Sequence, residues 1–351
     1  MRIFHVITLS SVGGAQSVVV NLANRQVLDN EVYVISSADG EAWKALDPRV
    51  RTIGIKQLHR EISWRDAFVL LRLIWCRLRL RPDIVHLHSS KIGALGRIAF
   101  APRKTLYTVH GFDSIRVANR KFLGIEKRLQ RRCSAIVGVS RYDLDNLRAE
   151  GITHNVSFVY NGIADCGPSA ETASPQAAAR LKELRTRYEK IVMCIARDDA
   201  PKRMDLFLDT AARFPQYAFV WVGNGRDYDK PDNAVLLGRI PMADRLLDQA
   251  DLFMLCSDFE GLPMSIIEAL SHGKPVVASA VGGIAELLDG TNGHAVENRP
   301  EAFAEKIEAI FADDGRYETM SHAARATYER SFTIDSMEDG YRKIYDRINR
   351  K

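Results

Sequence analysis

Short apolar runs separated by helical patterns limit this chain to one class of fold. In the N-terminal half the runs occupy residues 3–9, 31–37, 83–90, 105–112, 135–140 and 156–162. In the C-terminal half they occupy residues 191–197, 218–225, 234–240, 251–257 and 275–280. Near-continuous apolar strands that alternate with helices are typical of parallel sheets covered on both faces. The sequence therefore predicts an α/β protein with two doubly wound, Rossmann-like domains.

A stretch rich in Ala, Ser, Pro and Gly, residues 164–179, separates the two halves. This composition is typical of a linker. We expect an N-terminal domain at 1–165, a linker at 166–180 and a C-terminal domain at 181–333. Residues 334–351 have apolar side chains at helical spacing, and we expect a last helix there that packs back on the N-terminal domain.

Composition excludes several classes of protein. The longest apolar run is far shorter than the ~20 residues that span a bilayer. The start, MRIFHVITLS, lacks a hydrophobic region followed by a cleavage site, so we expect a first strand instead of a signal peptide. The cysteines include no close pair, which argues against a zinc site or a disulfide framework and favours the reducing cytoplasm. They are Cys76, Cys133, Cys166, Cys194 and Cys256.

Charge is distributed unevenly along the chain. Residues 1–165 contain 25 Lys/Arg and 14 Asp/Glu, whereas residues 166–351 contain 24 and 30. The segment 56–132 supplies most of the excess, with 18 basic and 5 acidic residues. Such a local excess suggests an anionic partner, either a membrane or a nucleic acid. No nucleic-acid-binding motif is present, so we expect a membrane surface and no nucleic acid.

In open parallel sheets, ligands bind beyond the carboxyl ends of the strands. The loops that follow the predicted strands are rich in glycine, polar and charged residues, and we expect both sets to face one central cleft. In the first half they include Gly13-Gly14, His88-Ser89-Ser90-Lys91, His110-Gly111 and Asn161-Gly162. In the second half they include Arg197–Arg203, Gly223-Asn224-Gly225, Gly238-Arg239 and Ser257–Pro263.

One of these loops leads into a helix with an acid on each side of its start. Pro263 fits the first helical turn and Gly273 fits the helix end. The amides around residues 262–265 then form an anion site suited to phosphate. Glu268 could bond a ribose diol, and Glu260 a sugar. Equally, Glu260 could only complement the helix dipole while Glu268 is solvated.

Two cations, Arg197 and Lys202, follow another predicted strand. Arginine offers a fork and lysine a point charge, which together suit a diphosphate. Isolated pairs of this kind are often ordinary surface charge. The helix-end anion site favours the functional interpretation.

The segment Glu260-Gly261-Leu262-Pro263 through Glu268, followed by ALSHGKPVVAS and GGIAELL, resembles the signature of retaining glycosyltransferases of family 4. Those enzymes have the GT-B fold. The resemblance continues in Arg197 and Lys202 and in VGNG, LLGRI, VYNGI, VSRYDLDNL, TVHGF, HLHSSKIGALGR and GGAQ. It covers nearly the whole chain. The two-glutamate motif with the Arg/Lys pair is specific, whereas single elements such as VGNG are weak.

The resemblance implies transfer of a sugar from a nucleotide diphosphate, with retention. The implied catalytic residues are His110, Arg197, Lys202 and Glu260. The implied donor-binding residues are Gly14, Arg197, Lys202, Gly238, Arg239, Ile240, Glu260, Gly261, Leu262, Pro263, Met264 and Glu268. The implied acceptor-side residues are Gly13, Gly14, His88, Ser89 and Lys91. The family often has Gly where Ala196 and Arg203 stand, and Pro where Tyr160 stands.

We expect no metal and no cofactor. The DYD motif at Asp227–Asp229 could hold a metal for a nucleotide sugar, but it follows GNGR in an apparent surface loop, so a solvated turn is expected. His86 and His88 lie two apart on a predicted strand. We expect His86 to be buried and His88 to face the cleft.

Residues 64–82, WRDAFVLLRLIWCRLRLRP, combine Trp, Leu and Arg at helical spacing. Such a helix could lie in a membrane interface, or it could be a core helix with solvated arginines. The predicted membrane face comprises Trp64, Arg72, Trp75, Arg77, Arg79 and Arg81. Together with HSSKIGALGR and EGLP, which resemble enzymes that build bacterial surface polysaccharides, it favours a polyprenyl-diphosphate-linked saccharide acceptor.

We therefore expect a cytoplasmic enzyme associated peripherally with the inner membrane. Alternatives are a soluble glycosyltransferase with a small acceptor and a nucleotide-sugar-binding module without catalysis. A glycoside hydrolase would not explain the Arg/Lys pair. A nicotinamide enzyme is disfavoured because SSVGGAQS lacks the G-x-G-x-x-G spacing.

Overall fold

The computed structural model describes residues 1–38, 40–165 and 174–350. The chain divides into two compact units. The N-terminal unit comprises Met1–Ala164 and Ile334–Lys351, and the C-terminal unit comprises Asp165–Thr333. Residues 166–173 of the predicted linker, including Cys166, lie outside the described residues.

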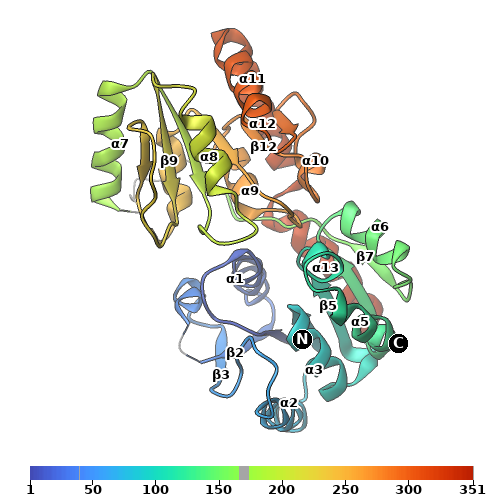
Figure 1. The fold of residues 1–351 in the computed structure, drawn as a ribbon. Helices are drawn as coiled ribbons and strands as arrows, with labels where there is room; N and C mark the ends of the chain where they lie inside the picture. Colours follow the sequence, from blue (N-terminus) through green and yellow to red (C-terminus); the bar gives the residue numbers. More distant parts are fainter. Residues whose placement is uncertain (39, 166–173, 351) are drawn as a thin grey trace. The chain divides into compact units, whose positions relative to one another are not determined.

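A seven-stranded, wholly parallel sheet forms the centre of the N-terminal unit, in the order β3-β2-β1-β4-β5-β6-β7 (Figure 1). The strands are β1 Arg2–Ile7, β2 Glu31–Ser37, β3 Arg51–Ile55, β4 Ile84–His88, β5 Thr105–Val109, β6 Ala135–Gly138 and β7 Val156–Phe158. The helices are α1 Gly14–Gln26, α2 Asp66–Leu80, α3 Ser90–Ala99, α4 Asp113–Arg116, α5 Leu123–Leu129, α6 Arg141–Ala149 and α13 Ile334–Asn349.

The two faces of this sheet are covered by different helices because strand side chains alternate between faces. Phe4 and Val6 of β1 pack in one core with apolar residues of α2, α3 and α5. Ile7 packs on the other face with Val19 of α1, in a second core. Helix α13 also contacts α1 and β4, so the end of the chain belongs to this second face.

The C-terminal unit contains a six-stranded parallel sheet in the order β10-β9-β8-β11-β12-β13. Its strands are β8 Lys190–Ile195, β9 Tyr217–Val222, β10 Ala234–Leu236, β11 Leu252–Leu255, β12 Val276–Ser279 and β13 Gly293–Val296. Its helices are α7 Pro175–Arg187, α8 Met204–Ala211, α9 Met264–Ser271, α10 Ile284–Leu287, α11 Pro300–Phe311 and α12 Asp314–Ser331, with a 3₁₀ segment η5 at Ala243–Gln249.

Two details differ from the sequence prediction. Helix α7 begins at Pro175, inside the predicted linker, because the Ser174 hydroxyl accepts a hydrogen bond from the Ala177 amide and proline suits the first helical position. Strands β3 and β13 were not predicted. Each is a short strand at a sheet edge, where an apolar run is not needed. Within the described residues, no helix is long and apolar enough to cross a membrane.

Candidate functional site

At the carboxyl edge of the C-terminal sheet, the loops after β8 and β11 are joined by backbone contacts. Lys202 and Ser257 form an antiparallel bridge, and the Asp258 amide donates to the Pro201 carbonyl at 2.9 Å. This pairing brings the Lys202 ammonium against the Glu260 carboxylate, to which the Ser257 hydroxyl also donates at 2.7 Å. The two side chains are only 17% and 12% exposed. The structure therefore brings together a predicted cation and a predicted acid.

The other two basic side chains of this loop are arranged differently. Arg197 is 59% exposed and lies 3.3 Å from the Asp199 carboxylate. Arg203 pairs instead with Asp205 at 2.6 Å and with Asp258 at 3.0 Å, and these hydrogen bonds raise its pKa above the usual value. Arg197 is thus accessible to an anion, while Arg203 is held by two carboxylates.

Helix α9 begins one residue later than predicted, with Pro263 at the N-cap and its carbonyl accepting from the Ile266 amide at 3.2 Å. Extended backbone at Pro263 (φ −67°, ψ 124°) keeps it outside the first turn. Among the described residues, the amides of Met264 and Ser265 have no acceptor. Such orphan donors at a helix N-terminus bind anions.

The helix end is as predicted. Gly273 has a φ of +63°, its amide donates to the Leu270 carbonyl, and the Lys274 amide donates to the Ala269 carbonyl. These two hydrogen bonds form the Schellman motif, which favours glycine at the left-handed position.

Glu268 lies on α9 and is partly buried. Burial, with a smaller contribution from the Asp244 carboxylate, raises its pKa to about 8. The side chain therefore carries a proton at neutral pH in the free protein. A ligand that donates hydrogen bonds to its carboxylate form would displace that proton.

The loops after β9 and β10 lie at the same edge. The Gly223 amide donates to the Gly238 carbonyl at 2.7 Å, and Asn224 accepts from the Gly238 amide at 2.8 Å. Gly238 has a φ of +72°, which leaves Arg239 exposed and Ile240 partly buried. Both polar backbone groups of Gly238 are therefore hydrogen-bonded within the loop.

The exposed residues Asp227 and Asp229 flank Tyr228, whose hydroxyl donates to the Asp198 carboxylate at 3.2 Å. The DYD motif therefore lies in irregular surface backbone held by a hydrogen bond from its tyrosine, with both acids exposed.

Gly282, in the loop after β12, was not singled out from the sequence. Its φ is +58°, and a Cβ atom there would lie 1.9 Å from the Glu260 carbonyl oxygen. The next amide, of Gly283, donates to the Gly261 carbonyl at 2.8 Å. The glycine pair in VGGI therefore supports the loop that carries Glu260. A Gly-Gly dipeptide directly after a predicted strand was the available signal.

At the carboxyl edge of the N-terminal sheet, the prediction for His88 is wrong. It is fully buried, since it lies on the same face of β4 as His86, under α1 and α13. Its ring contacts His110, which follows β5 and is only partly buried. His110 can meet a ligand, whereas His88 can act only through it.

The other predicted acceptor-side residues lie at the starts of α1 and α3. Gly13 is the N-cap of α1 and Gly14 its exposed first residue. Ser89, with φ +70°, is bonded to Thr8 at 2.7 Å. Lys91 pairs with Asp66 at 2.7 Å and donates to the carbonyls of residues 59 and 61. Lys91 therefore anchors the start of α2, and its role as an acceptor-side cation stays a prediction.

Helix α2 and the segment before it expose large apolar side chains, which from Trp64 onward recur at spacings of three and four. We call this set the α2 face: Ile62 (68% exposed), Trp64 (75%), Phe68 (52%), Leu71 (62%), Trp75 (47%) and Leu78 (67%). The opposite side of the helix, with Val69, Leu73 and Cys76, is buried. The Arg72 guanidinium lies 4.2 Å from the centre of the Trp75 ring. Arg79 and Arg81 are exposed, and Arg77 donates to the Ala99 carbonyl at 3.0 Å.

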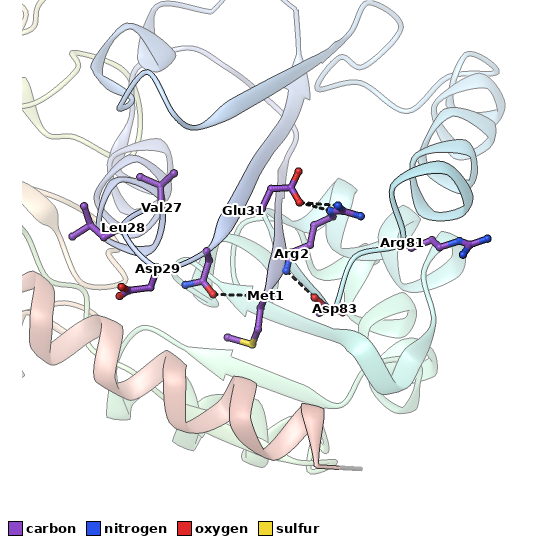
Figure 2. A pocket seen from close by; sticks show the side chains of 9 residues that line it. Met1, Arg2, Val27, Leu28, Asp29, Glu31, Arg81 and Asp83 are labelled. Atoms are coloured by element: carbon purple, nitrogen blue, oxygen red, sulfur yellow. Dashed lines mark hydrogen bonds and ion pairs between the residues drawn. The ribbon is translucent and has the colours of Figure 1, made fainter.

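A hollow of about 630 Å³ opens at the opposite, amino-terminal edge of the N-terminal sheet. Figure 2 shows Arg2 in this hollow, where it contacts both Glu31 and Asp83. The Glu31 carboxylate lies 2.7 Å from the Arg2 guanidinium, and Asp83 accepts from the Arg2 amide at 2.8 Å. Arg2 and Glu31 neutralise each other, and parallel sheets bind ligands at the opposite edge. Candidate functional residues are therefore sought at the carboxyl edge of each sheet separately.

Two family models match the chain. The model described as Glycosyltransferase Family 4 matches residues 12–165, and the model described as Glycosyl transferases group 1 matches residues 189–313. Among curated proteins, the O-antigen biosynthesis glycosyltransferase WbnH of Escherichia coli is 27% identical over 97% of each chain. The E. coli UDP-Gal:alpha-D-GlcNAc-diphosphoundecaprenol alpha-1,3-galactosyltransferase is 26% identical over 98% of this chain and 96% of that one.

Two of the similar solved structures cover nearly the whole chain. Anabaena Alr3699/HepE in complex with UDP and glucose superposes with a TM-score of 0.83 at 19% identity, covering 98% of this chain and 99% of that one. Sucrose-phosphate synthase from Thermosynechococcus elongatus also gives a TM-score of 0.83 at 19% identity, covering 99% of each.

Proposed function

The chain belongs to the glycosyltransferases, with a family 4 domain followed by a group 1 domain, and we propose that it transfers a sugar with retention to a polyprenyl-diphosphate-linked saccharide. It has the GT-B fold predicted from the sequence, and it is a nucleotide-sugar-dependent enzyme of the kind found among O-antigen biosynthesis proteins. Retention and the identity of the acceptor are the proposal.

The contact between Lys202 and Glu260 is the observation that best supports the donor chemistry. The bond between the anomeric carbon and the diphosphate oxygen breaks, and negative charge develops on the leaving diphosphate. Lys202, the exposed Arg197 and the free amides at the start of α9 are cationic or dipolar groups that stabilise such charge. In the free protein Glu260 neutralises Lys202. A bound diphosphate takes over the lysine and leaves Glu260 able to accept hydrogen bonds from the donor sugar.

The remaining donor contacts follow the sequence prediction. We assign the ribose diol to Glu268 and the base to the backbone of Gly238, Arg239 and Ile240. Gly261 and Leu262 allow close approach of the sugar diphosphate to the backbone. We assign a hydroxyl of the reacting sugar to His110, and Gly13 and Gly14 to the phosphate or acceptor.

A lipid-linked acceptor is supported by two independent observations. The name of the galactosyltransferase relative describes a sugar acceptor linked to diphosphoundecaprenol. The α2 face exposes aromatic and aliphatic side chains beside Arg72, Arg79 and Arg81. Next to it, a hollow of about 530 Å³ is lined by Phe68, Leu71, Trp75 and basic residues. An apolar face with cations beside it suits the interface of an anionic leaflet.

Vesicle binding tests the membrane part of the proposal. Basic residues near an anionic surface contribute ~1 kcal/mol each within a screening length of ~8 Å. We expect binding to vesicles that contain phosphatidylglycerol and loss of that binding in high salt. Changing Arg72, Arg77, Arg79 and Arg81 to Gln should weaken it strongly. A matched control changes four basic residues of the C-terminal unit: Lys182, Arg187, Arg213 and Arg299. Equal binding by both variants contradicts the proposal.

The reaction itself is tested with a screen of nucleotide sugars by thermal shift, followed by turnover of the best hit. The acceptors are a polyprenyl-diphosphate-linked saccharide and the same saccharide without its lipid. We expect transfer to the lipid-linked form and a product with the anomeric configuration of the donor, read by NMR. Faster transfer to the free saccharide favours the soluble alternative. Binding of donors without any transfer favours a nucleotide-sugar-binding module.

A further inference from the structure

Imidazole rings gather on one face of the N-terminal sheet, where a parallel-sheet core normally holds aliphatic side chains. The register pairs His5 of β1 with His86 of β4, and His88 of β4 with Thr108 of β5. All three histidines are fully buried, under α1 and α13. Buried polar groups are tolerated only where hydrogen bonds satisfy them. The hydrogen bonds of this cluster therefore offset the cost of burying its ring nitrogens.

A continuous row of hydrogen bonds leads from α1 to His110. Gln26 Oε1 lies 2.9 Å from His5 Nε2. His5 Nδ1 lies 3.1 Å from His88 Nε2, and His88 Nδ1 lies 3.0 Å from His110 Nε2. We call these four residues the histidine relay. Burial lowers the pKa of His5 and of His110 to about 4 and that of His88 well below its usual value, so the rings are neutral.

The direction of the relay follows from its first member. A neutral imidazole has one N–H donor and one acceptor nitrogen. Because the oxygen of Gln26 can only accept, His5 donates from Nε2 and accepts at Nδ1. His88 must then donate from Nε2 to His5 and accept at Nδ1 from His110. Each ring is thereby held in the same tautomer, with its proton on Nε2.

A side branch is consistent with this direction. The amide nitrogen of Gln26 lies 3.5 Å from the Tyr345 hydroxyl, and that hydroxyl lies 2.8 Å from His86 Nδ1. The Tyr345 hydroxyl accepts from Gln26 and donates to His86, so His86 donates from Nε2 to Thr108 Oγ1 at 2.7 Å. One orientation of the Gln26 amide therefore satisfies both branches.

We propose that Gln26, His5 and His88 are positioning residues that fix the tautomer of His110 and make its Nδ1 a hydrogen-bond acceptor for a substrate hydroxyl. Among the described residues, Nδ1 of His110 has no hydrogen-bond partner, and the side chain is only partly buried. The lone pair accepts from O–H groups and repels phosphate oxygens. That the hydroxyl belongs to a sugar rests on the proposed function; the relay itself does not.

Metal binding is the competing explanation for the cluster. Ligand nitrogens of His5, His86 and His88 all lie within 4.8 Å of one another. Each ring nitrogen of His5 and His86 already has a hydrogen-bond partner, as do both nitrogens of His88. No carboxylate belongs to this group, so a divalent charge would be buried without a counter-charge. The histidine relay and its side branch through His86 account for every one of these contacts.

Nitrogen NMR of histidine-labelled protein, without substrate, tests the relay directly, because the ring shifts distinguish the two tautomers. We expect His5, His88 and His110 to carry their protons on Nε2. Gln26→Met removes the acceptor, and His110 should then populate both tautomers. His88→Asn keeps an oxygen near the position of Nδ1 and should preserve the His110 tautomer. His86→Leu is the matched control, because it removes an equally buried ring outside the row and should leave His110 unchanged.

Turnover of the same variants tests the link to the substrate. Loss of one neutral hydrogen bond corresponds to about a 3- to 10-fold lower rate. We expect this loss in Gln26→Met, with partial retention in His88→Asn. A proton on Nδ1 of His110 in the wild type, or stoichiometric metal in the purified protein, overturns the relay. So does an equal tautomer change in His86→Leu. Unchanged rates despite a changed tautomer overturn the role in substrate binding, and absence of all transferase activity overturns only the proposed function.

Discussion

The carboxyl edges of the two parallel sheets contain opposite kinds of chemistry. At the N-terminal sheet, buried neutral imidazoles satisfy one another, and only His110 reaches the surface in part. At the C-terminal sheet, ions lie at the edge: Lys202 and Glu260 pair with each other, and Arg197 is exposed. The first arrangement fixes the geometry before a ligand arrives. In the second arrangement a charged ligand can replace one member of the ion pair between Lys202 and Glu260.

This difference has an energetic reason. A neutral ring can be buried at low cost once both nitrogens are hydrogen-bonded. A buried charge requires an opposite charge beside it, and removing one member of a buried ion pair leaves the other charge uncompensated. We therefore expect substitutions at the C-terminal edge to change turnover more than substitutions at the N-terminal edge.

The largest expected effect is that of Lys202→Ala. It removes a cation from the leaving diphosphate and leaves the Glu260 carboxylate without its partner. Loss of one such electrostatic group lowers the rate by ~10²–10³-fold. Arg197→Ala should also lower turnover strongly. Arg203→Ala is the matched control, because Arg203 contacts Asp205 and Asp258 instead. Wild-type kcat in both Lys202→Ala and Arg197→Ala, at saturating donor, contradicts the diphosphate assignment.

Gly282→Ala should produce the next largest effect. The new Cβ would lie 1.9 Å from the Glu260 carbonyl, so the loop that carries Glu260 has to move. We expect turnover to fall more than tenfold and stability to fall by about 1–3 kcal/mol, as for other strained insertions. Gly290→Ala is the control, since its φ is also positive (+89°) but no atom lies within 4 Å of the added Cβ. Equal losses of turnover in the two variants would attribute the effect to backbone strain alone.

The sequence predicted two parallel sheets and most of their strands, because buried parallel strands produce continuous apolar runs. It did not predict β3 and β13, whose runs RTIGI and GHAV are short and lie at sheet edges. It also extended the linker too far, since the alanines after Ser174, which belong to α7, resembled a linker.

Side-chain partners were harder to predict than elements. Lys91 was expected at the acceptor, but its ammonium binds Asp66 and two carbonyls, which no local pattern reveals. The spacing of His86 and His88 did contain a signal, because residues two apart on a strand share a face. That rule places His88 beside buried His86. His5 and Gln26 were missed because a single polar residue in an apolar run has no visible partner in the sequence.

Nucleotide binding should release a proton from Glu268. The carboxyl is protonated at pH 7 in the free protein, because burial raises its pKa to about 8. If the ribose diol bonds its carboxylate, binding of a nucleoside diphosphate releases up to one proton at pH 7. Calorimetry in buffers of different ionisation enthalpy measures this release.

Glu268→Gln should abolish the proton release and weaken the nucleotide by about tenfold, the scale of a hydrogen bond to a charged group. Glu260→Gln should weaken binding of the nucleotide sugar only, since the bare nucleotide lacks the sugar that Glu260 contacts. Equal losses with nucleotide and nucleotide sugar in both variants contradict this division of roles.

The buried imidazoles predict a smaller effect, on stability alone. Their pKa values in the folded protein lie below the ordinary 6.5, so the unfolded chain binds protons first as the pH falls. Their stabilising contribution is complete above pH 6.5 and is lost toward pH 4. Between pH 6.5 and 5 each histidine accounts for about 2 kcal/mol. Urea unfolding of the N-terminal unit at the two pH values measures the slope. His5→Gln should reduce it, and an unchanged slope contradicts the buried neutral state.

The smallest expected effect is that of a chelator, which should leave turnover unchanged. The C-terminal edge already supplies positive charge through Arg197, Lys202 and the amides of Met264 and Ser265, where other enzymes of nucleotide sugars use a divalent cation. The acids of the DYD motif are exposed and flank a tyrosine that bonds Asp198. We expect neither carboxyl edge to need a metal ion. The edge of the N-terminal sheet contains neutral imidazole rings, and the edge of the C-terminal sheet supplies its own cations. We would measure turnover after dialysis against EDTA and again after adding Mg²⁺ or Mn²⁺. A loss of activity that either ion restores would show that the cations of this edge do not suffice, and would make the diphosphate a metal-bound ligand.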